Sequence, residues 1–195
     1  MALSKAVFLD RDGVITEDPP HYAHRLDQLK IISGSARAIQ LLNAHRFFVV
    51  VISNQSGVAR GYYHETDVKI FNNGIEALLA KNGAHIDAIY YCPHHPDAAV
   101  MQYKLNCECR KPKPGMILRA AEKFSLNLEQ SFVVGDKWSD IEAGHAAGCK
   151  TVMVLTGHGK DETSKKQGSA DYIAKDLCEA VEKYILRADM NPGDD

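Results

Sequence analysis

The stretch Lys5-Ala-Val-Phe-Leu-Asp10-Arg-Asp12-Gly13 decides the fold. Its apolar run is short and ends in polar residues and a glycine, which predicts a buried strand. An almost wholly apolar, β-branched run at 47–52 is typical of a strand covered on both faces. Further strands are expected at 86–92, 131–134 and 151–155, with helices at 35–45, 64–82, 115–124 and 140–147 and a helical stripe at 177–185. Strands that alternate with helices predict a single Rossmann-like parallel α/β sheet flanked by helices, and no large inserted cap is expected.

Length and composition point to one ordinary globular domain. The chain has 195 residues, 45% hydrophobic and 25% charged, and we expect a domain at 1–190 with a disordered tail at 191–195. A formal charge of −2 gives no broad basic field for nucleic acid or an anionic membrane. The N-terminus lacks the pattern of a signal peptide, and no apolar run could span a bilayer. We therefore expect a cytoplasmic protein that binds a small molecule, as a monomer.

Polar clusters follow four of the predicted strands. In a parallel sheet, ligands bind beyond the carboxyl ends of the strands, so these clusters are expected to converge there. The clusters are Asp10-Arg-Asp12, Ser53-Asn-Gln55, Cys92-Pro-His94 and Gly135-Asp-Lys137.

Asp10 and Asp12 are spaced by two, so in an extended chain both side chains point the same way. Two carboxylates this close repel each other unless a cation neutralises them, and Mg²⁺ prefers such oxygen ligands. With the cation bound, one carboxylate can act as a nucleophile and the other can shuttle a proton. The alternative interpretation is two solvated carboxylates in a turn.

The segment after the strand at 131–134 offers a further metal ligand. Asp136 can reach a metal shared with Asp10, and Asp140 could hold either Lys137 or the waters of that metal. The alternative role for Asp136 or Asp140 is to cap the following helix.

Two other segments could bind a phosphorylated sugar. Ser53 can donate its hydroxyl to a phosphate oxygen, and the amides of Asn54 and Gln55 suit sugar hydroxyls. Lys111 offers a point charge to a phosphoryl group, and Arg110 offers a planar fork to a second phosphate. The alternatives are turn residues in the first segment and a solvated basic loop in the second.

A long loop is expected between Pro93 and Pro114, and its stretch 92–109 contains candidate ligands for a metal. Cys92-x-His94 is followed, after twelve residues, by Cys107-x-Cys109. Three thiolates and one imidazole complete a tetrahedral set for Zn²⁺ with no position left for water, which predicts a structural site. His95 is a rival ligand because it adjoins His94.

Taken together, the strand-end motifs resemble the haloacid dehalogenase superfamily of phosphotransferases. The matching segments are Phe8-Leu-Asp10-Arg-Asp12-Gly13, Ser53, Lys111 and Gly135-Asp136-x-x-x-Asp140. The resemblance implies that Asp10 attacks phosphorus, while Asp12 protonates the leaving oxygen and then activates water. It also implies that Ser53 and Lys111 hold the phosphoryl oxygens. Mg²⁺ would then bind Asp10, the carbonyl of Asp12 and Asp136, with Asp140 behind these ligands. Val14 stands where the superfamily often has threonine.

Longer motifs resemble those of the D-glycero-D-manno-heptose 1,7-bisphosphate 7-phosphatase family. They are the Asp10 motif, Asn54-Gln-Ser-Gly-Val-Ala-Arg-Gly61, Tyr91-Cys-Pro-His-His-Pro96, Cys109-Arg-Lys-Pro112 and Val134-Gly-Asp-Lys137. The resemblance implies a bacterial phosphatase that acts on a sugar bisphosphate, with Lys137 among the substrate contacts and Arg110 on the distal phosphate. It also implies a substrate-facing flap made of Pro19, Pro20, His21 and Tyr22. The flap departs from the family, which usually has glycine-tyrosine in place of His21-Tyr22.

Two other functions remain open. Histidinol-phosphate phosphatase is a close relative with a similar zinc loop, although that loop is usually shorter than the one here. A catalytically dead, zinc-braced interaction module is the alternative from outside enzymology, but such a protein should have lost at least one of Asp10, Asp12, Lys111 or Asp136.

Overall fold

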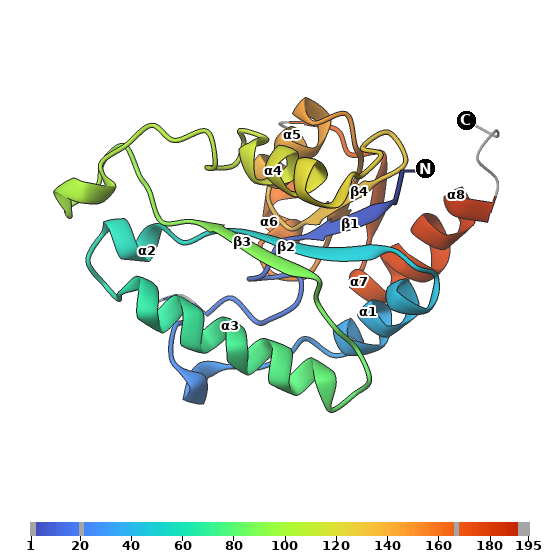
Figure 1. Ribbon diagram of the computed structural model, residues 1–195, viewed down its shortest axis with the longest axis horizontal. Coiled ribbons are helices and arrows are strands. Elements are labelled where there is room, and N and C mark those ends of the chain that lie inside the picture. Colours follow the sequence, from blue (N-terminus) through green and yellow to red (C-terminus); the bar gives the residue numbers. More distant parts are fainter. Residues whose placement is uncertain (1–2, 20–21, 166–167, 191–195) are drawn as a thin grey trace.

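A six-stranded parallel sheet forms the centre of the computed structural model, which describes residues 3–19, 22–165 and 168–190. The strand order is β3-β2-β1-β4-β5-β6, so the first strand lies in the middle (Figure 1). The strands are β1 (Ala6–Leu9), β2 (Phe48–Asn54), β3 (Ala88–Cys92), β4 (Phe132–Gly135), β5 (Lys150–Val154) and β6 (Tyr172–Ala174). The predicted parallel α/β fold is confirmed.

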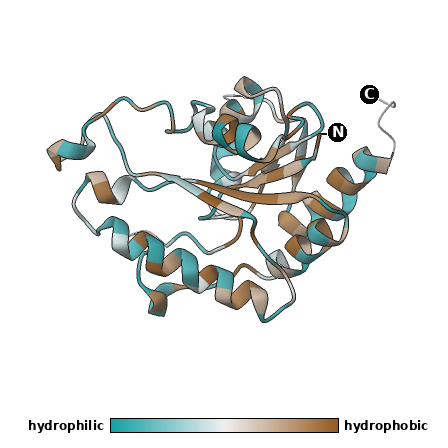
Figure 2. Ribbon diagram, in the orientation of Figure 1, coloured by the Kyte–Doolittle hydropathy of each residue, from teal (hydrophilic) through white to brown (hydrophobic). Residues whose placement is uncertain are grey.

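Both faces of the sheet are buried, which explains why the central strands are apolar at successive positions. Along β1, Val7 and Leu9 pack into one core cluster, whereas Ala6 and Phe8 pack into the cluster on the other face. Figure 2 shows β1 and β2 as predominantly hydrophobic, while α3 carries hydrophilic and hydrophobic residues on different sides.

Helices cover the sheet in two layers (Figure 1). On one face lie α1 (Ser35–Ala44), α3 (Glu65–Ala80) and a C-terminal helical segment made of α7 (Leu177–Glu179), the π-helical turns Ala180–Ile185 and α8 (Leu186–Met190). On the other face lie α4 (Gly115–Phe124) and α5 (Trp138–Ala146). The shorter elements are α2 (Ser56–Ala59), α6 (Gly159–Ser164) and the 3-10 turns Leu26–Gln28 and Met101–Tyr103.

The differences from the predicted boundaries have local causes. β2 continues to Asn54 because its last residues still pair with β3, in the register Ser53↔Tyr91 and Asn54↔Cys92. α5 begins two residues earlier than predicted, since the Asp140 carboxylate accepts a hydrogen bond from the Lys137 amide, 3.1 Å away, and so caps the first turn. The short elements α2, α6 and β6 were not predicted.

Two long segments leave the carboxyl edge of the sheet. The chain between β1 and α1 contains the flap, and the zinc loop (residues 93–114) connects β3 to α4. Within the described part of the chain, no helix combines the length and the apolar character that crossing a membrane requires.

Candidate active site

Lys111 joins the polar residues at the carboxyl ends of β1 and β2 to those that follow β4. Its Nζ lies 2.9 Å from Asp10 Oδ1 and 2.7 Å from Asp140 Oδ1, and it donates to the Ile52 carbonyl at 2.8 Å. The side chain is only 4% exposed. Burial acts to lower the pKa of Lys111, but the charges of Asp10 and Asp140 outweigh it and raise that pKa. Lys111 therefore stays positively charged beside Asp10.

Asn54 fixes the backbone from which Lys111 projects. Its Nδ2 donates to the Lys111 carbonyl at 3.0 Å, and its Oδ1 accepts from the Lys111 amide at 3.1 Å. The amide of Asn54 is thus used to place Lys111, although this residue also lines the cavity in front of Asp10.

Three carboxylates gather around one point at the sheet edge. One oxygen each from Asp10, Asp136 and Asp140 lies within 4.8 Å of the others, and all three residues are buried. Burial, followed by the charge of Asp10, raises the pKa of Asp136 to about 8. Its Oδ2 accepts from the His158 amide at 2.8 Å, whereas its buried Oδ1 has no hydrogen-bond partner among the described residues. A buried oxygen without a partner, in a residue that lies beside two other acids, suits a divalent cation.

Glycines make room for the Asp136 carboxylate. A Cβ atom at Gly13 would lie 2.2 Å from Asp136 Oδ2, and one at Gly157 would lie 2.3 Å from the same atom. Both glycines also have positive φ angles, +88° and +54°. A side chain at either position would strain the backbone and displace the carboxylate.

Arg11 holds the side chain of Asp12, a contact that was not predicted from the sequence. Its Nε and Nη2 donate to the two Asp12 oxygens, each at 2.9 Å. The guanidinium is buried: it donates to Asn72 Oδ1 at 3.1 Å and lies over the ring of Phe71, 4.7 Å from its centroid. The sequence shows Arg11 only as one polar residue between Asp10 and Asp12. Its burial in the structure is what reveals that it orients Asp12.

Gln55 hydrogen-bonds to both Arg11 and Asp12. It is 2% exposed, and its Nε2 donates to Asp12 Oδ2 at 2.9 Å and to Ser53 Oγ at 2.8 Å. Its Oε1 accepts from Arg11 and from the hydroxyl of Tyr63. The amide of Gln55 thus has partners inside the protein, and the predicted contact between Gln55 and a sugar stays a prediction. Ser53, by contrast, lines the small cavity together with Asp10, Asp12 and Lys111.

A cavity of about 440 Å³ extends outward from the small cavity, and the two share Asn54 and Lys111 in their walls. Pro19, Tyr22 and Arg110 line the larger cavity. Pro20 and His21, the other predicted flap residues, lie outside the described residues.

The Asp18 carboxylate, next to the flap, connects this segment to Lys137 and His158. Asp18 Oδ2 accepts from Lys137 Nζ at 3.0 Å and lies 3.1 Å from His158 Nε2. Lys137 Nζ also lies 3.9 Å from Asp136 Oδ1. The sequence did not single out Asp18 or His158, because their positions in loops reveal no contact until the fold brings the loops together.

The zinc loop brings its predicted ligands together. Cys92, His94, Cys107 and Cys109 each offer a ligand atom within 4.8 Å of the others, and His95 is not part of this group. The distances from His94 Nδ1 to Cys92 Sγ and to Cys109 Sγ are both 3.7 Å. Ligands of a tetrahedral zinc with Zn–S bonds of about 2.3 Å are separated by roughly this much. Burial, followed by the neighbouring thiols, raises the pKa of Cys109, a cost that a bound cation would offset.

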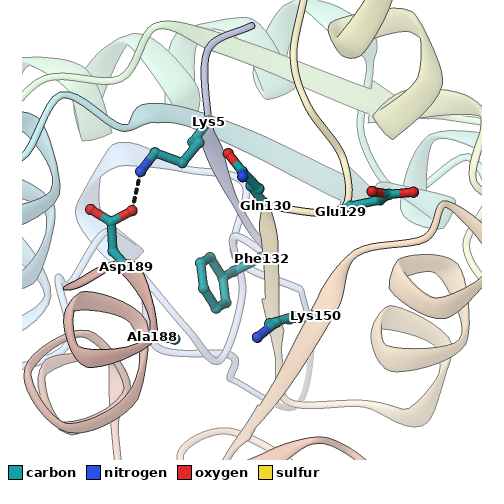
Figure 3. Close-up of a pocket in the computed structure, with 7 residues that line it drawn as sticks. All are labelled: Lys5, Glu129, Gln130, Phe132, Lys150, Ala188 and Asp189. Atoms are coloured by element: carbon teal, nitrogen blue, oxygen red, sulfur yellow. Dashed lines mark hydrogen bonds and ion pairs between the residues drawn. The ribbon is translucent and has the colours of Figure 1, made fainter. Parts of the chain in front are cut away.

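A third cavity lies at the opposite, amino edge of the sheet. It measures about 180 Å³, and Figure 3 shows Lys5 and Asp189 pointing toward each other across it, joined by an ion pair, with Phe132 beside them. Lys150 and Glu129 lie on its other side. None of the predicted site residues lines this cavity.

Relatives of known function match nearly the whole chain. A D-glycero-beta-D-manno-heptose-1,7-bisphosphate 7-phosphatase from Pasteurella multocida is 42% identical over 91% of this chain and 95% of the relative. The enzyme of the same name from Escherichia coli K12 is 39% identical over 91% of this chain and 94% of its own length. The chain belongs to the D-glycero-β-D-manno-heptose-1,7-bisphosphate 7-phosphatase family. Members of this family are phosphatases, so the protein is a phosphomonoester hydrolase.

Two further comparisons agree with this family assignment. Residues 108–180 match a family described as HAD-hydrolase-like. A crystal structure of D,D-heptose 1,7-bisphosphate phosphatase from B. bronchiseptica, complexed with magnesium and phosphate, superposes with a TM-score of 0.86 at 32% identity. The match covers 94% of this chain and 99% of the other. A heptose phosphatase of the same fold therefore holds both ions.

Proposed function

We propose that this enzyme removes the 7-phosphate from D-glycero-D-manno-heptose 1,7-bisphosphate, in the supply of nucleotide-activated heptose for lipopolysaccharide or other surface glycans. The observation that carries the proposal is the meeting of Asp10, Lys111 and Asp136 in one buried cluster at the carboxyl edge of the sheet. Membership of the heptose phosphatase family supplies the substrate.

Asp10 attacks the phosphorus atom and forms an aspartyl-phosphate. Its Oδ1 accepts from the Arg11 amide at 2.7 Å and lies 2.9 Å from Lys111 Nζ, so the carboxylate is oriented before substrate arrives. The O–P bond to Asp10 forms as the P–O bond to the sugar breaks. Lys111 and the Ser53 hydroxyl bind the phosphoryl oxygens, where negative charge is concentrated during transfer.

Asp12 serves both halves of the reaction as acid and base. It gives its proton to the leaving sugar oxygen, and it then takes a proton from the water that attacks the aspartyl-phosphate. Inorganic phosphate is released and Asp10 is restored. Arg11 and Gln55 hold both oxygens of Asp12, which fixes the direction in which the carboxyl group faces.

The carboxylate cluster fits Mg²⁺. Asp10 and Asp136 would hold it with the carbonyl oxygen of Asp12, and the orphan Oδ1 of Asp136 supports this assignment. Asp140 would stay behind these ligands, because its two oxygens already face Lys111 Nζ and the Lys137 amide. When bound, the ion neutralises charge on the carboxylates and on the phosphoryl group.

The larger cavity would hold the sugar and its second phosphate. Pro19, Tyr22 and Lys137 line its flap side, and Arg110 lines its zinc-loop side. Its volume of about 440 Å³ is within the usual range of small-molecule sites. Pro20 and His21 remain proposed contacts, since they belong to the same flap.

The Cys92–His94–Cys107–Cys109 cluster would hold a structural Zn²⁺. Arg110 and Lys111 directly follow its last ligand, so zinc would fix the approach of both cations to the substrate. Reduced thiols are needed for this role, which favours the cytoplasm as the site of action. We expect the enzyme to work as a monomer.

The two alternative functions are less well supported. Histidinol phosphate carries a single phosphate, so it would leave Arg110 without an anion. A catalytically dead module would have no use for the complete set of buried charges around Asp10.

A panel of substrates with saturating Mg²⁺ tests the proposal. The kcat/KM for the heptose 1,7-bisphosphate should exceed that for histidinol phosphate and for other sugar bisphosphates. A clear preference for histidinol phosphate would overturn the assignment.

A further inference from the structure

Three side chains with N–H donors lie near one another on the zinc-loop side of the larger cavity, and Arg110 is the one that lines it. Arg110 lines the cavity, Arg60 follows α2, and His95 lies in the zinc loop. The distance from Arg60 Nη2 to His95 Nε2 is 3.5 Å. The Arg110 guanidinium donates to the carbonyl of His94, the residue directly before His95, so Arg110 lies beside the Arg60–His95 pair.

Arg60 and His95 face each other as two donors. The ring nitrogen Nδ1 of His95 accepts from the Asp97 amide at 3.0 Å, so the ring hydrogen must be on Nε2. Nε2 is also the atom that faces the Arg60 guanidinium, which has no acceptor lone pair. Two N–H groups cannot bond each other, but the oxygen of an anion can accept from both.

The cluster also has an excess of positive charge. Arg11, Arg25 and Arg37 each pair with a carboxylate, whereas within residues 3–19, 22–165 and 168–190 neither Arg60 nor Arg110 has one at ion-pair distance. Arg110 Nη1 donates only to the His94 carbonyl, at 3.3 Å. The acidic groups nearby are the thiols of Cys92 and Cys109, the phenol of Tyr22 and the Asp97 carboxylate near His95.

Backbone hydrogen bonds hold the two segments in this arrangement. The Val100 amide in the zinc loop donates to the Ala59 carbonyl at 3.0 Å, directly before Arg60. The His95 amide donates to the Tyr103 carbonyl at 3.1 Å. Gly61 follows Arg60 with a φ of +76°, so the chain turns sharply there. The donors are therefore preorganised, and little ordering is needed when an anion binds.

We propose that Arg60 and His95 complete, with Arg110, a subsite for the second phosphate of the substrate. The two guanidinium groups and the Nε2–H of His95 would donate to the oxygens of the phosphate that is not hydrolysed. The inference rests on the proposed function, because it assumes a substrate with two phosphates. It makes Arg60 and His95 determinants of specificity for a bisphosphate over a monophosphate.

Kinetics on a matched pair of substrates test the subsite. For Arg60→Ala and His95→Ala, KM for the heptose 1,7-bisphosphate should rise about 10- to 100-fold with little change in kcat, since each loses a hydrogen bond to a charged group. With heptose 7-phosphate, which lacks the second phosphate, kcat/KM should stay at the wild-type value. His95→Gln keeps an N–H donor and should restore most of the lost affinity. Arg37→Ala, in α1 at an exposed ion pair with Glu182, is the control for loss of a positive charge.

Two results would overturn the subsite: an unchanged KM for the bisphosphate, or an equal loss on both substrates. If the wild-type enzyme does not hydrolyse the heptose bisphosphate, the proposed function fails separately. The subsite is then tested by titrating the Asp10→Asn protein with fructose 1,6-bisphosphate and fructose 6-phosphate. A preference for the bisphosphate that Arg60→Ala removes supports the subsite, and a preference that Arg60→Ala leaves intact contradicts it.

Discussion

The three acids at the strand ends, Asp10, Asp136 and Asp140 (the strand-end cluster), and the zinc loop contribute to one site. They are held in place by different means. Asp10 and Asp136 directly follow strands in the middle of the sheet, and the Asp10 amide donates to the Val134 carbonyl at 3.0 Å. The zinc loop has little core of its own, since Met101 is 75% exposed and Leu105 is 50% exposed. Yet this loop delivers Lys111, one of the most buried charges in the site.

The difference predicts where the site would depend on zinc. Packing of the sheet alone can place Asp10, the proposed nucleophile, but Lys111, the proposed phosphate-binding cation, needs a brace outside the hydrophobic core. The brace consists of the Cys/His cluster, the Asn54 amide and the Glu65 carboxylate, which accepts from the hydroxyls of Tyr91 and Tyr103. Damage to the two regions should therefore have distinguishable consequences.

The largest effect is expected at the strand-end cluster. Asp10→Asn removes the attacking oxygen, so kcat/KM should fall by about 10⁴-fold or more. The melting temperature should not fall, because the substitution removes one charge from a crowded set of buried acids. Residual full activity would mean that the nucleophile is misassigned.

Loss of zinc should come next. Cys109→Ser should release the metal and lower kcat/KM by about 10²- to 10³-fold with Mg²⁺ saturating, because Lys111 and Arg110 lose their fixed approach. Cys178→Ser is the matched control, since this cysteine lies outside the cluster. Unchanged kcat/KM in protein verified to be free of zinc would contradict the brace.

A smaller loss of activity is expected when Arg11, which orients Asp12, is changed. Arg11→Lys keeps the charge but loses the paired hydrogen bonds to Asp12, so kcat should fall about 10- to 100-fold with little change in KM. Arg25→Lys, at an exposed pair with Asp27, should leave both constants unchanged. An equal change in KM and kcat would indicate a general disturbance of the active site. It would contradict a specific role of Arg11 in orienting Asp12.

The smallest effect concerns stability and pH. Without metal, Asp136 keeps its proton up to about pH 8 in the folded protein, whereas in the unfolded chain it loses it near 3.8. The folded state then binds more protons across this range, so stability should fall as the pH rises through it. Thermal unfolding in EDTA should show a melting temperature that drops by on the order of several degrees between about pH 5 and pH 8. Added Mg²⁺ should stabilise more at the higher pH, and a flat profile without metal would contradict the buried position of Asp136.

Most of the fold could be predicted because the central strands are buried on both faces and therefore stand out as apolar runs. β6 was not predicted because it is an edge strand of only three residues. It is not buried on both faces, since Ile173 is 51% exposed. The short helix α2 was not predicted for a similar reason, because four residues show no helical period.

The site was partly predictable for the same physical reason. Acids that follow apolar strands must meet at one edge of a parallel sheet, which is why Asp10 and Asp136 could be paired in advance. The contacts of Arg11, Asp18 and His158 depend instead on how side chains pack between segments distant in sequence. The hydrogen bonds from Gln55 to Asp12 and Ser53 could not be predicted either, because the neighbours of Gln55 decide where its amide points.

Trapping the covalent intermediate tests the central claim most directly. The Asp12→Asn protein should form the aspartyl-phosphate but hydrolyse it slowly, since it lacks the base that activates water. After acid quenching with substrate and Mg²⁺, mass spectrometry should find one added phosphoryl group on the peptide that contains Asp10, and none in the Asp10→Asn protein. A phosphoryl group on any other residue, or an equal yield without Asp10, would contradict the account.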